Sequence, residues 1–473
     1  MQLDIRLTAD RGTPEALALP VFPEQEGQFD EELTAFLEQA EHKGKAGETA
    51  ALPRPLGTPR KTYLIGVGEG GEAGWRAFGA ALTRAASRET SVTVGLPAGL
   101  TTAELSGLAE GLRLAAYRFR AVPLSEDKAP KLAEVILAGE ADEQAVQAGI
   151  VTAEVTLAAR DWVNTHSGEK TPEWLAEQFR AAAEAVGGVD VKIWEPGQLA
   201  DEGFGGILAV GGGSTRGPRL VQLTWAPEGA TQHVVLVGKG ITFDTGGISI
   251  KPAAAMLLMR KDMGGAAAVA AAVLGAARLK LPVKITVLTP LAENAVSESA
   301  FRPGDIVTHW GGGTTEILNT DAEGRVVLAD ALAYAAANLS PDYLIDLATL
   351  TGAQNVSLGK KTAALFSDAP DLAKALTEAG EQVGERMWQL PLPADYVDDL
   401  RSDVADWVNS TEVGAGTVMA ALYLREYAGA ARDRWAHLDM SSVAWTEGAD
   451  KEFSKGATGW GTRMLIRWLS TLA

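Results

Sequence analysis

Short apolar runs alternate with stretches of helical periodicity along the chain, and this alternation predicts an α/β protein. In the first part of the chain, the apolar runs predict strands and the periodic stretches between them predict helices. The predicted strands cover residues 3–7, 63–67, 92–96 and 134–138. The predicted helices include residues 73–86 and 102–117. Residues 44–60 are rich in Gly, Pro and Lys and are expected to form an exposed loop.

A long helical pattern at residues 142–163 separates this part from the rest of the chain. A turn-like break follows, and Thr171-Pro172 then has the form of a helix N-cap with proline at the first helical position. The length of 473 residues is typical of two domains. We therefore expect a smaller N-terminal α/β domain over residues 1–160, ending in a linker helix, and a larger C-terminal domain over residues 161–473.

The C-terminal part continues the alternation of strands and helices. Its predicted strands cover residues 189–194, 220–225, 234–237, 284–288 and 343–347. Its predicted helices cover residues 172–185, 264–277, 325–338, 371–383 and 417–428. This order predicts a mostly parallel or mixed sheet flanked by helices, in which ligands bind beyond the carboxyl ends of the strands. Lys239 directly follows the strand at 234–237 and is therefore expected at the ligand-binding edge.

Composition and charge narrow the class of protein. Apolar residues make up 46% of the chain and charged residues 22%, which indicates a folded chain with large cores rather than a disordered one. The net charge of −19 disfavours nucleic acid and anionic membranes as partners. The chain has no cysteine, which excludes disulfides, thiolate zinc sites and cysteine nucleophiles. The first residues lack the pattern of a secretion signal, and no apolar run reaches the roughly 18 residues that span a bilayer, so a cytoplasmic location is expected.

The segment at residues 319–325, Asn-Thr-Asp-Ala-Glu-Gly-Arg, carries the strongest chemical signal. Asp321 and Glu323 stand two residues apart on a predicted turn, where their carboxylates can hold one cation or bridge two. Arg325 would face the positive field of such cations unless an anion or a substrate oxygen lay between them. The alternative is that both carboxylates only favour the N-terminus of the helix predicted to follow.

Two further clusters of ionisable residues lie upstream. Lys239, Asp244 and Lys251 stand close together in a glycine-rich stretch. A lysine directly after a buried strand is costly to bury unless it is paired or deprotonated, although each lysine could also be solvated or salt-bridged. Asp262 precedes a helix of small residues, where it is either a helix N-cap or a ligand. The three clusters together suggest a dinuclear metal centre built from oxygen ligands and lysine.

These clusters resemble the leucyl aminopeptidase family of dinuclear metallopeptidases. The segment at residues 319–325 is similar to the signature of that family. Similarity extends to residues 237–251, 262–265, 293–294, 302–305, 348–352 and 436–439. The resemblance covers most of residues 160–473 and implies that the C-terminal domain is catalytic. The N-terminal domain resembles the family only in its size and α/β pattern, and we assign it to assembly or regulation.

The resemblance implies a set of metal ligands. Asp244 and Glu323 would bridge two divalent metal ions. Lys239 and Asp262 would complete the tighter of the two sites, and Asp321 would complete the more exchangeable one. Carboxylate ligands suit manganese and magnesium, and zinc also accepts them, so Mn²⁺ or Zn²⁺ is expected.

The same resemblance implies roles for residues around the metal ions. Lys251 would polarise the scissile carbonyl, and Arg325 would hold a bicarbonate ion that acts as the base. Met259 and Gly352 are expected to line the substrate pocket. Leu257 stands where the family usually has an acidic residue, which affects the pocket and not the ligands.

The expected function is that of an aminopeptidase acting on short peptides with a free N-terminus. The resemblance also implies a homohexamer. Two alternatives remain open at this point. One is a two-metal phosphoesterase, because carboxylate-bound metal pairs also serve phosphoryl chemistry. The other is a DNA-binding or regulatory protein of the same family, which the net charge of −19 disfavours.

Overall fold

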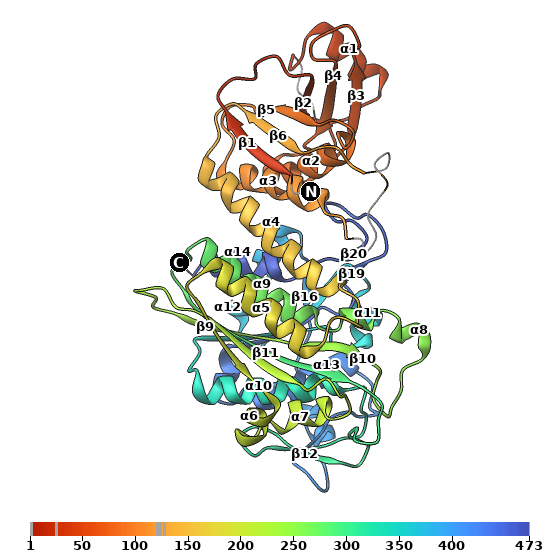
Figure 1. Cartoon of the computed structure of the whole chain (residues 1–473), viewed down its shortest axis with the longest axis vertical. Coiled ribbons are helices and arrows are strands. Elements are labelled where there is room, and N and C mark those ends of the chain that lie inside the picture. Colours follow the sequence, from red (N-terminus) through yellow and green to blue (C-terminus); the bar gives the residue numbers. More distant parts are fainter. Residues whose placement is uncertain (1–2, 24–26, 120–124, 126–128, 473) are drawn as a thin grey trace. The chain divides into compact units, whose positions relative to one another are not determined.

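The computed structural model describes residues 3–23, 27–119, 125 and 129–472 (Figure 1). The chain divides into two compact units. The first comprises Met1–Leu157 and Thr446–Gly456, and the second comprises Ala158–Trp445 and Ala457–Ala473. The segment Thr446–Gly456 thus groups with the first unit, although it lies within residues 161–473, which the sequence analysis assigns to the C-terminal domain.

The first unit is built on a six-stranded sheet with the order β1-β6-β5-β2-β4-β3. All neighbouring strands are parallel except β3, which runs antiparallel to β4 at the edge. The strands are β1 (Asp4–Thr8), β2 (Ala16–Val21), β3 (Thr49–Pro53), β4 (Lys61–Gly66), β5 (Ser91–Gly95) and β6 (Glu134–Ala138). The helices are α1 (Glu31–Gln39), α2 (Gly71–Ala85), α3 (Thr102–Ala116) and α4 (Glu143–Asn164), the last of which crosses the boundary between the units.

Most of the elements expected in this unit are confirmed. The helix α3 begins with a reciprocal capping box, in which the Thr101 hydroxyl accepts from the Glu104 amide and the Glu104 carboxylate accepts from the Thr101 amide. The expectation of a loop at residues 44–60 is wrong in part, because β3 lies within it and pairs with β4. Glycine and proline flank this edge strand, so composition alone hides it. The strand β2 and the helix α1 are additions to the expected elements.

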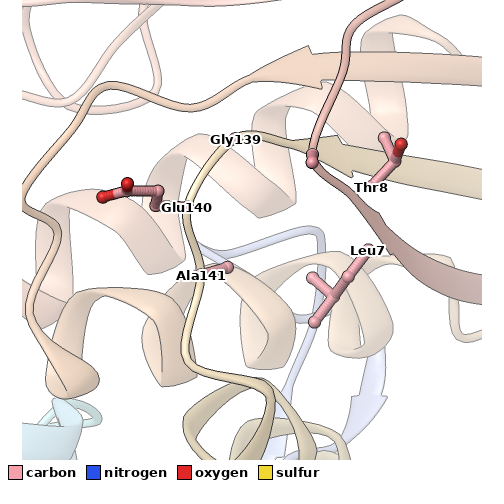
Figure 2. A pocket seen from close by; sticks show the side chains of 6 residues that line it. Leu7, Thr8, Gly139, Glu140 and Ala141 are labelled. Carbon is pink, nitrogen blue, oxygen red and sulfur yellow. The ribbon is translucent and has the colours of Figure 1, made fainter.

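A pocket of about 350 Å³ lies at the carboxyl ends of β1 and β6 in the first unit (Figure 2). Its lining is mostly apolar or small and comprises Leu7, Thr8, Ala9, Gly139, Glu140 and Ala141. Of these described lining residues, Glu140 alone is ionisable, and Figure 2 shows its carboxylate directed away from Leu7. The pocket therefore presents little polar chemistry to a ligand.

The second unit contains a nine-stranded sheet with the order β16-β15-β18-β14-β9-β11-β8-β7, in which β10 also pairs with β11. The central strands β18, β14, β9, β11 and β10 are parallel, whereas β8 and β7 continue the sheet in antiparallel fashion. The strands are β7 (Val189–Trp194), β8 (Arg219–Trp225), β9 (His233–Gly238), β10 (Gly240–Asp244), β11 (Lys284–Asn294), β14 (Tyr343–Ala348), β15 (Ala363–Phe366), β16 (Met387–Gln389) and β18 (Trp435–Asp439). The expectation of a mixed sheet is confirmed.

Helices cover both faces of this sheet (Figure 1). One face carries α5 (Pro172–Val186), α9 (Gly264–Arg278), α12 (Pro370–Val383) and α14 (Thr462–Ser470). The other carries α6 (Pro196–Asp201), α7 (Gly205–Gly211), α10 (Glu323–Asn338) and α13 (Gly416–Tyr427). The remaining α-helices and strands are α8 (Ala253–Met256), α11 (Gly352–Leu358), β12 (Ile306–Thr308), β13 (Thr314–Glu316), β17 (Trp407–Val408), β19 (Trp445–Thr446) and β20 (Gly456–Ala457).

Local signals at the start of α5 are confirmed, because the Thr171 hydroxyl accepts from the Trp174 amide and Pro172 occupies the first helical position. The strand β11 extends to Asn294 instead of ending near residue 288. This extension brings its carboxyl end beside that of β10. Among the described residues, none of the helices has the length and apolar character needed to cross a membrane.

Candidate metal centre

The carboxyl ends of the central parallel strands bring together residues that are far apart in the sequence. Lys239 follows β9, Asp244 ends β10, and Glu323 is the first residue of α10. Asp262 follows a short 3-10 turn, η1 (Met259–Lys261), that precedes α9. The three carboxylates of Asp244, Asp262 and Glu323 are buried, and one oxygen from each lies within 4.8 Å of the others.

The amine of Lys239 lies between two of these carboxylates. Its Nζ is 2.8 Å from Asp262 Oδ2 and 2.9 Å from Glu323 Oε1, and it donates to the Thr349 carbonyl oxygen at 3.1 Å. Only 3% of the side chain is exposed. Burial by itself lowers the pKa of Lys239, but the carboxylates of Asp262 and Glu323 outweigh burial and raise it above its ordinary value. In the absence of a metal ion these carboxylates favour the ammonium form of Lys239, and a dication bound beside it would displace its proton.

A second lysine lies at the more open side of the cluster. Lys251 Nζ is 2.7 Å from Asp244 Oδ2 and also forms an ion pair with Asp321. Its side chain is 13% exposed, whereas that of Asp321 is 32% exposed. Burial lowers the pKa of Lys251, but the carboxylates of Asp244 and Glu323 outweigh it and raise the pKa. The structure thus brings together Lys239, Asp244, Lys251, Asp262, Asp321 and Glu323, as the sequence analysis expects.

The cluster carries more negative than positive charge. Four carboxylates face two ammonium groups, which leaves two formal negative charges when all six groups are ionised. Burial, followed by the carboxylate of Asp244, raises the pKa of Glu323 to about 8. Burial also raises the pKa values of Asp262 and Asp321. Such a set fits divalent metal ions, because carboxylates are hard oxygen ligands and a neutral lysine amine can add a nitrogen ligand.

Neighbouring polar groups orient the carboxylates. Asp244 Oδ1 accepts from the Gly246 amide and from Asn294 Nδ2, both at 2.8 Å. The same Asn294 amide group donates to the Thr320 carbonyl oxygen at 3.0 Å and so links β11 to the segment 319–325. The Thr349 hydroxyl donates to Asp262 Oδ1 at 2.8 Å. These contacts leave the other oxygens of Asp244 and Asp262 directed toward the lysines, as a second layer of ligand-orienting groups does.

The structure excludes the helix N-cap alternative for Asp262 and leaves both alternatives open for Glu323. The residue that precedes α9 is Met263, and Asp262 is not its N-cap. Its carboxylate contacts Lys239 and Thr349 instead. Glu323 does lie in the first turn of α10, where a carboxylate is favoured by the helix dipole, but its side chain is directed to Lys239.

Arg325 is a buried arginine with spare hydrogen-bonding capacity. Its Nη1 donates to the Asn409 carbonyl oxygen at 2.8 Å, whereas its Nε is buried and has no hydrogen-bond partner among the described residues. Within the described part of the chain, no carboxylate forms an ion pair with it. Burial lowers the pKa of Arg325. A buried guanidinium with a free donor fits a small anion, because such a charge is costly without a counter-ion.

Asn409 is a residue that the sequence analysis missed. Its Oδ1 accepts from the Leu318 amide at 2.8 Å and from the Asn319 amide at 3.2 Å, and its Nδ2 donates to the Asn319 carbonyl oxygen at 2.7 Å. Through its own carbonyl it also holds Arg325. It follows the two-residue strand β17, and no local pattern marks it. Asn294, by contrast, lies in one of the segments that carry the family resemblance.

Met259 and Gly352 begin two short elements near Asp262 and its partner Thr349. Met259 begins the turn η1 that leads to Asp262, and its side chain is half-buried. Gly352 begins α11, three residues after Thr349, and is exposed, with open space where a Cβ would stand. Their role as pocket residues stays a prediction.

Buried carboxylates and lysines that converge at the carboxyl ends of a mixed α/β sheet are typical of hydrolases that use metal ions. Residues 157–466 match the catalytic domain of the cytosol aminopeptidase family, and residues 17–122 match its N-terminal domain. The chain belongs to the cytosol aminopeptidase family. The resemblance found in the sequence is therefore confirmed, and the chain is an aminopeptidase of the metallo-exopeptidase class.

Curated relatives and solved structures agree with this assignment. The chain is 41% identical over 479 residues to a probable cytosol aminopeptidase of Corynebacterium diphtheriae, with 97% of this chain and 94% of that protein covered. It is 41% identical to a probable cytosol aminopeptidase of Streptomyces coelicolor, with 93% and 90% covered. The solved structure of the bottromycin maturation enzyme BotP in complex with Mn is similar, with a TM-score of 0.88, 38% identity, and 97% of this chain and 99% of that chain covered.

Proposed function

We propose that this aminopeptidase removes the N-terminal residue from short peptides whose amino group is free, and that it does so in the cytoplasm with two bound divalent metal ions, Mn²⁺ or Zn²⁺. The observation that carries the proposal is the convergence of Asp244, Asp262 and Glu323 within 4.8 Å. Lys239 lies between two of them, and Asp321 lies at the more open side. The complex of BotP with Mn supports the choice of metal, and the names of the curated relatives support the location.

The ligands divide between the two ions by burial. Lys239 and Asp262 are almost fully buried and would complete the tighter site. Asp321, whose side chain is 32% exposed, would complete the more exchangeable site. Asp244 and Glu323 would bridge the two. Two ions held in this way would supply a Lewis acid and a water molecule of lowered pKa.

Lys251, at the more open side of the cluster, would act on the substrate and would not bind metal. In the structure, the Lys251 ammonium is held by the carboxylates of Asp244 and Asp321. Once those carboxylates serve as ligands, the ammonium is free to donate to the scissile carbonyl oxygen and to stabilise the oxyanion that develops. The Asp262 carboxylate would also receive the free amino group of the peptide, which explains the requirement for an unblocked N-terminus.

A proton acceptor is still required, and no side chain in the cluster is both uncommitted and basic. We assign this role to a bicarbonate ion held by Arg325, because its Nε is buried without a partner among the described residues. Met259 and Gly352 would line the pocket for the first side chain of the peptide, since they stand in sequence close to Asp262 and its partner Thr349.

Metal analysis combined with a panel of substrates tests this function. The purified protein is stripped with a chelator, checked by elemental analysis, and reloaded with Mn²⁺ or Zn²⁺. Activity on leucine dipeptides is expected to disappear on stripping and to return on loading, and N-acetylated dipeptides are expected to resist. Full activity without metal, or equal kcat/KM for free and acetylated peptides, would contradict the proposal.

Two control measurements address the other functions and the anion. Hydrolysis of a phosphate ester in preference to a leucine anilide would indicate a phosphoesterase. A salt-dependent mobility shift of DNA would indicate a regulatory protein. Family membership favours neither outcome.

Removal of bicarbonate from the buffer should lower the rate of the wild type and leave the already lower rate of Arg325→Met unchanged. An equal response of both proteins would remove bicarbonate from the mechanism.

A further inference from the structure

Lys170 is a buried cation that the proposed chemistry does not use. It lies between α4 and α5 in the second unit, and its side chain is fully buried. Its ammonium donates to three main-chain carbonyl oxygens, those of Trp162 at 3.2 Å, Val163 at 2.8 Å and Arg260 at 2.6 Å. Among the described residues, no carboxylate forms an ion pair with it. Carbonyl dipoles alone therefore balance the charge, as they do around a bound metal cation.

The three carbonyl groups come from two distant segments. Trp162 and Val163 lie in the last turn of α4, where helix carbonyls lack intrahelical partners and carry the negative end of the dipole. Arg260 lies in the turn η1, which leads directly to Asp262. Lys170 thus ties the end of a long helix to the main chain just before a proposed metal ligand.

Few other hydrogen bonds hold the turn η1, which packs beside β10 and places the Arg260 guanidinium over the Trp445 ring, 5.1 Å from its centroid. Its main chain is held internally by the Lys261 amide, which donates to the Leu258 carbonyl oxygen, and by the Asp262 amide, which donates to the Met259 carbonyl oxygen. The Lys261 ammonium donates outward to the Ser441 carbonyl oxygen at 2.7 Å. Unlike Asp244, which ends a strand of the sheet, Asp262 stands at the end of a turn. Thr349 and Lys239 hold its carboxylate, and the turn holds its main chain.

Only the protonated lysine can satisfy all three acceptors, because an ammonium group has three hydrogens and a neutral amine has two. Burial, with the nearby Arg260 guanidinium, lowers the pKa of Lys170 to about 7. The three carbonyl oxygens accept hydrogen bonds from the ammonium form, which such contacts favour over the neutral amine. The geometry therefore describes an ammonium group enclosed by oxygen atoms.

We propose that Lys170 is a positioning residue: its ammonium is a built-in cation that fixes the turn Met259–Lys261 and thereby places the Asp262 carboxylate for metal binding. This inference rests on the proposed role of Asp262 as a ligand of the tighter metal ion. A purely structural role, in which Lys170 only caps α4, would affect stability without affecting the metal.

Three variants separate these roles. Lys170→Met keeps an unbranched side chain of similar length but removes the charge and the three donors. Lys170→Ala leaves a space that matches propylammonium, the part of the side chain that is lost. Arg463→Met is the matched control, because Arg463 is also a fully buried cation of the second unit, and it pairs with Glu385, which is not part of the metal centre.

The readout is the Mn²⁺ affinity, measured by the electron paramagnetic resonance of free Mn²⁺ at a temperature where all variants are folded. Lys170→Met should bind about 10- to 100-fold more weakly than wild type, as expected when a group that orients a ligand is removed. Its kcat/KM should fall at limiting Mn²⁺ and recover at high Mn²⁺. Arg463→Met should lose thermal stability but keep the wild-type affinity.

Chemical rescue completes the test. Propylammonium should tighten Mn²⁺ binding by Lys170→Ala, and tetramethylammonium at equal ionic strength should not. Wild-type affinity in Lys170→Met, or equal losses in Lys170→Met and Arg463→Met, would overturn the inference. If Lys170→Met does not fold, the test is made with Lys170→Ala refolded in the presence of propylammonium. Recovery of the fold without recovery of Mn²⁺ binding would overturn the inference. A wild type that binds no Mn²⁺ would instead refute the proposed function itself.

Discussion

Gly324 offers a sharp test of the metal centre, because its missing side chain makes room for a proposed ligand. A Cβ built on Gly324 would stand 2.6 Å from both Nζ and Cε of Lys239 and 2.8 Å from its Cδ. Gly324 is the second residue of α10 and does not have a left-handed backbone. Alanine therefore suits the backbone at this position, and the three closest contacts of its methyl group would all be with Lys239.

The size of the effect follows from these distances. Ordinary contacts between heavy atoms begin at about 3.5 Å, so the methyl group of Gly324→Ala must displace the Lys239 amine by about 0.9 Å from the 2.6 Å approach. A metal site tolerates ligand displacements of about 0.2 Å. The long lysine side chain can move away without unfolding the protein, and alanine raises helix propensity by about 1 kcal/mol. We therefore expect Mn²⁺ affinity to fall on the order of 100-fold or more while the thermal stability of the chelator-stripped protein is maintained.

Isothermal titration with Mn²⁺ and thermal unfolding followed by circular dichroism measure both quantities. Gly197→Ala is the matched control, because Gly197 is the second residue of α6 and its Cβ would meet open space. It should bind Mn²⁺ as the wild type does. If Gly324→Ala binds two Mn²⁺ ions with wild-type affinity, Lys239 is not a ligand and its ion pairs with Asp262 and Glu323 are its only role.

Other outcomes follow from the same geometry. Lys251→Ala should keep both metal ions, and its kcat should fall by about 10²–10³-fold, as expected for the loss of one oxyanion donor. Lys239→Arg should lose metal, because a protonated guanidinium has no free lone pair. Measurements of metal content and kcat test both expectations. Because burial and Asp244 raise the pKa of Glu323 to about 8, protons compete with metal below that pH. Mn²⁺ affinity should then fall by about tenfold or more per pH unit from pH 8 to pH 6, and a flat profile would contradict this. Light scattering at micromolar concentration should give the mass of a homohexamer, and a monomer mass would refute that expectation.

Much of the fold is visible in the sequence because it follows from local rules. Periodicity locates most strands and helices, and Thr171 and Pro172 mark the start of α5. Local patterns do not predict the edge strand β3, because glycine and proline surround it. Its pairing with β4 stabilises it instead. A short strand at a sheet edge gains its stability from its neighbour, which the local sequence does not show.

The metal centre, too, is predicted only in part by local sequence patterns. The residue types available for metal binding can be read from the chain, above all Asp321, Glu323 and Arg325 in one short segment. Local patterns do not predict that Asp262 contacts Lys239 instead of capping α9, or that Lys170 contacts the turn before Asp262; the folded chain shows both. Metal ligation and the pairing of buried charges depend on distances through space. Those distances are set where parallel strands end side by side, between residues that local patterns treat as unrelated.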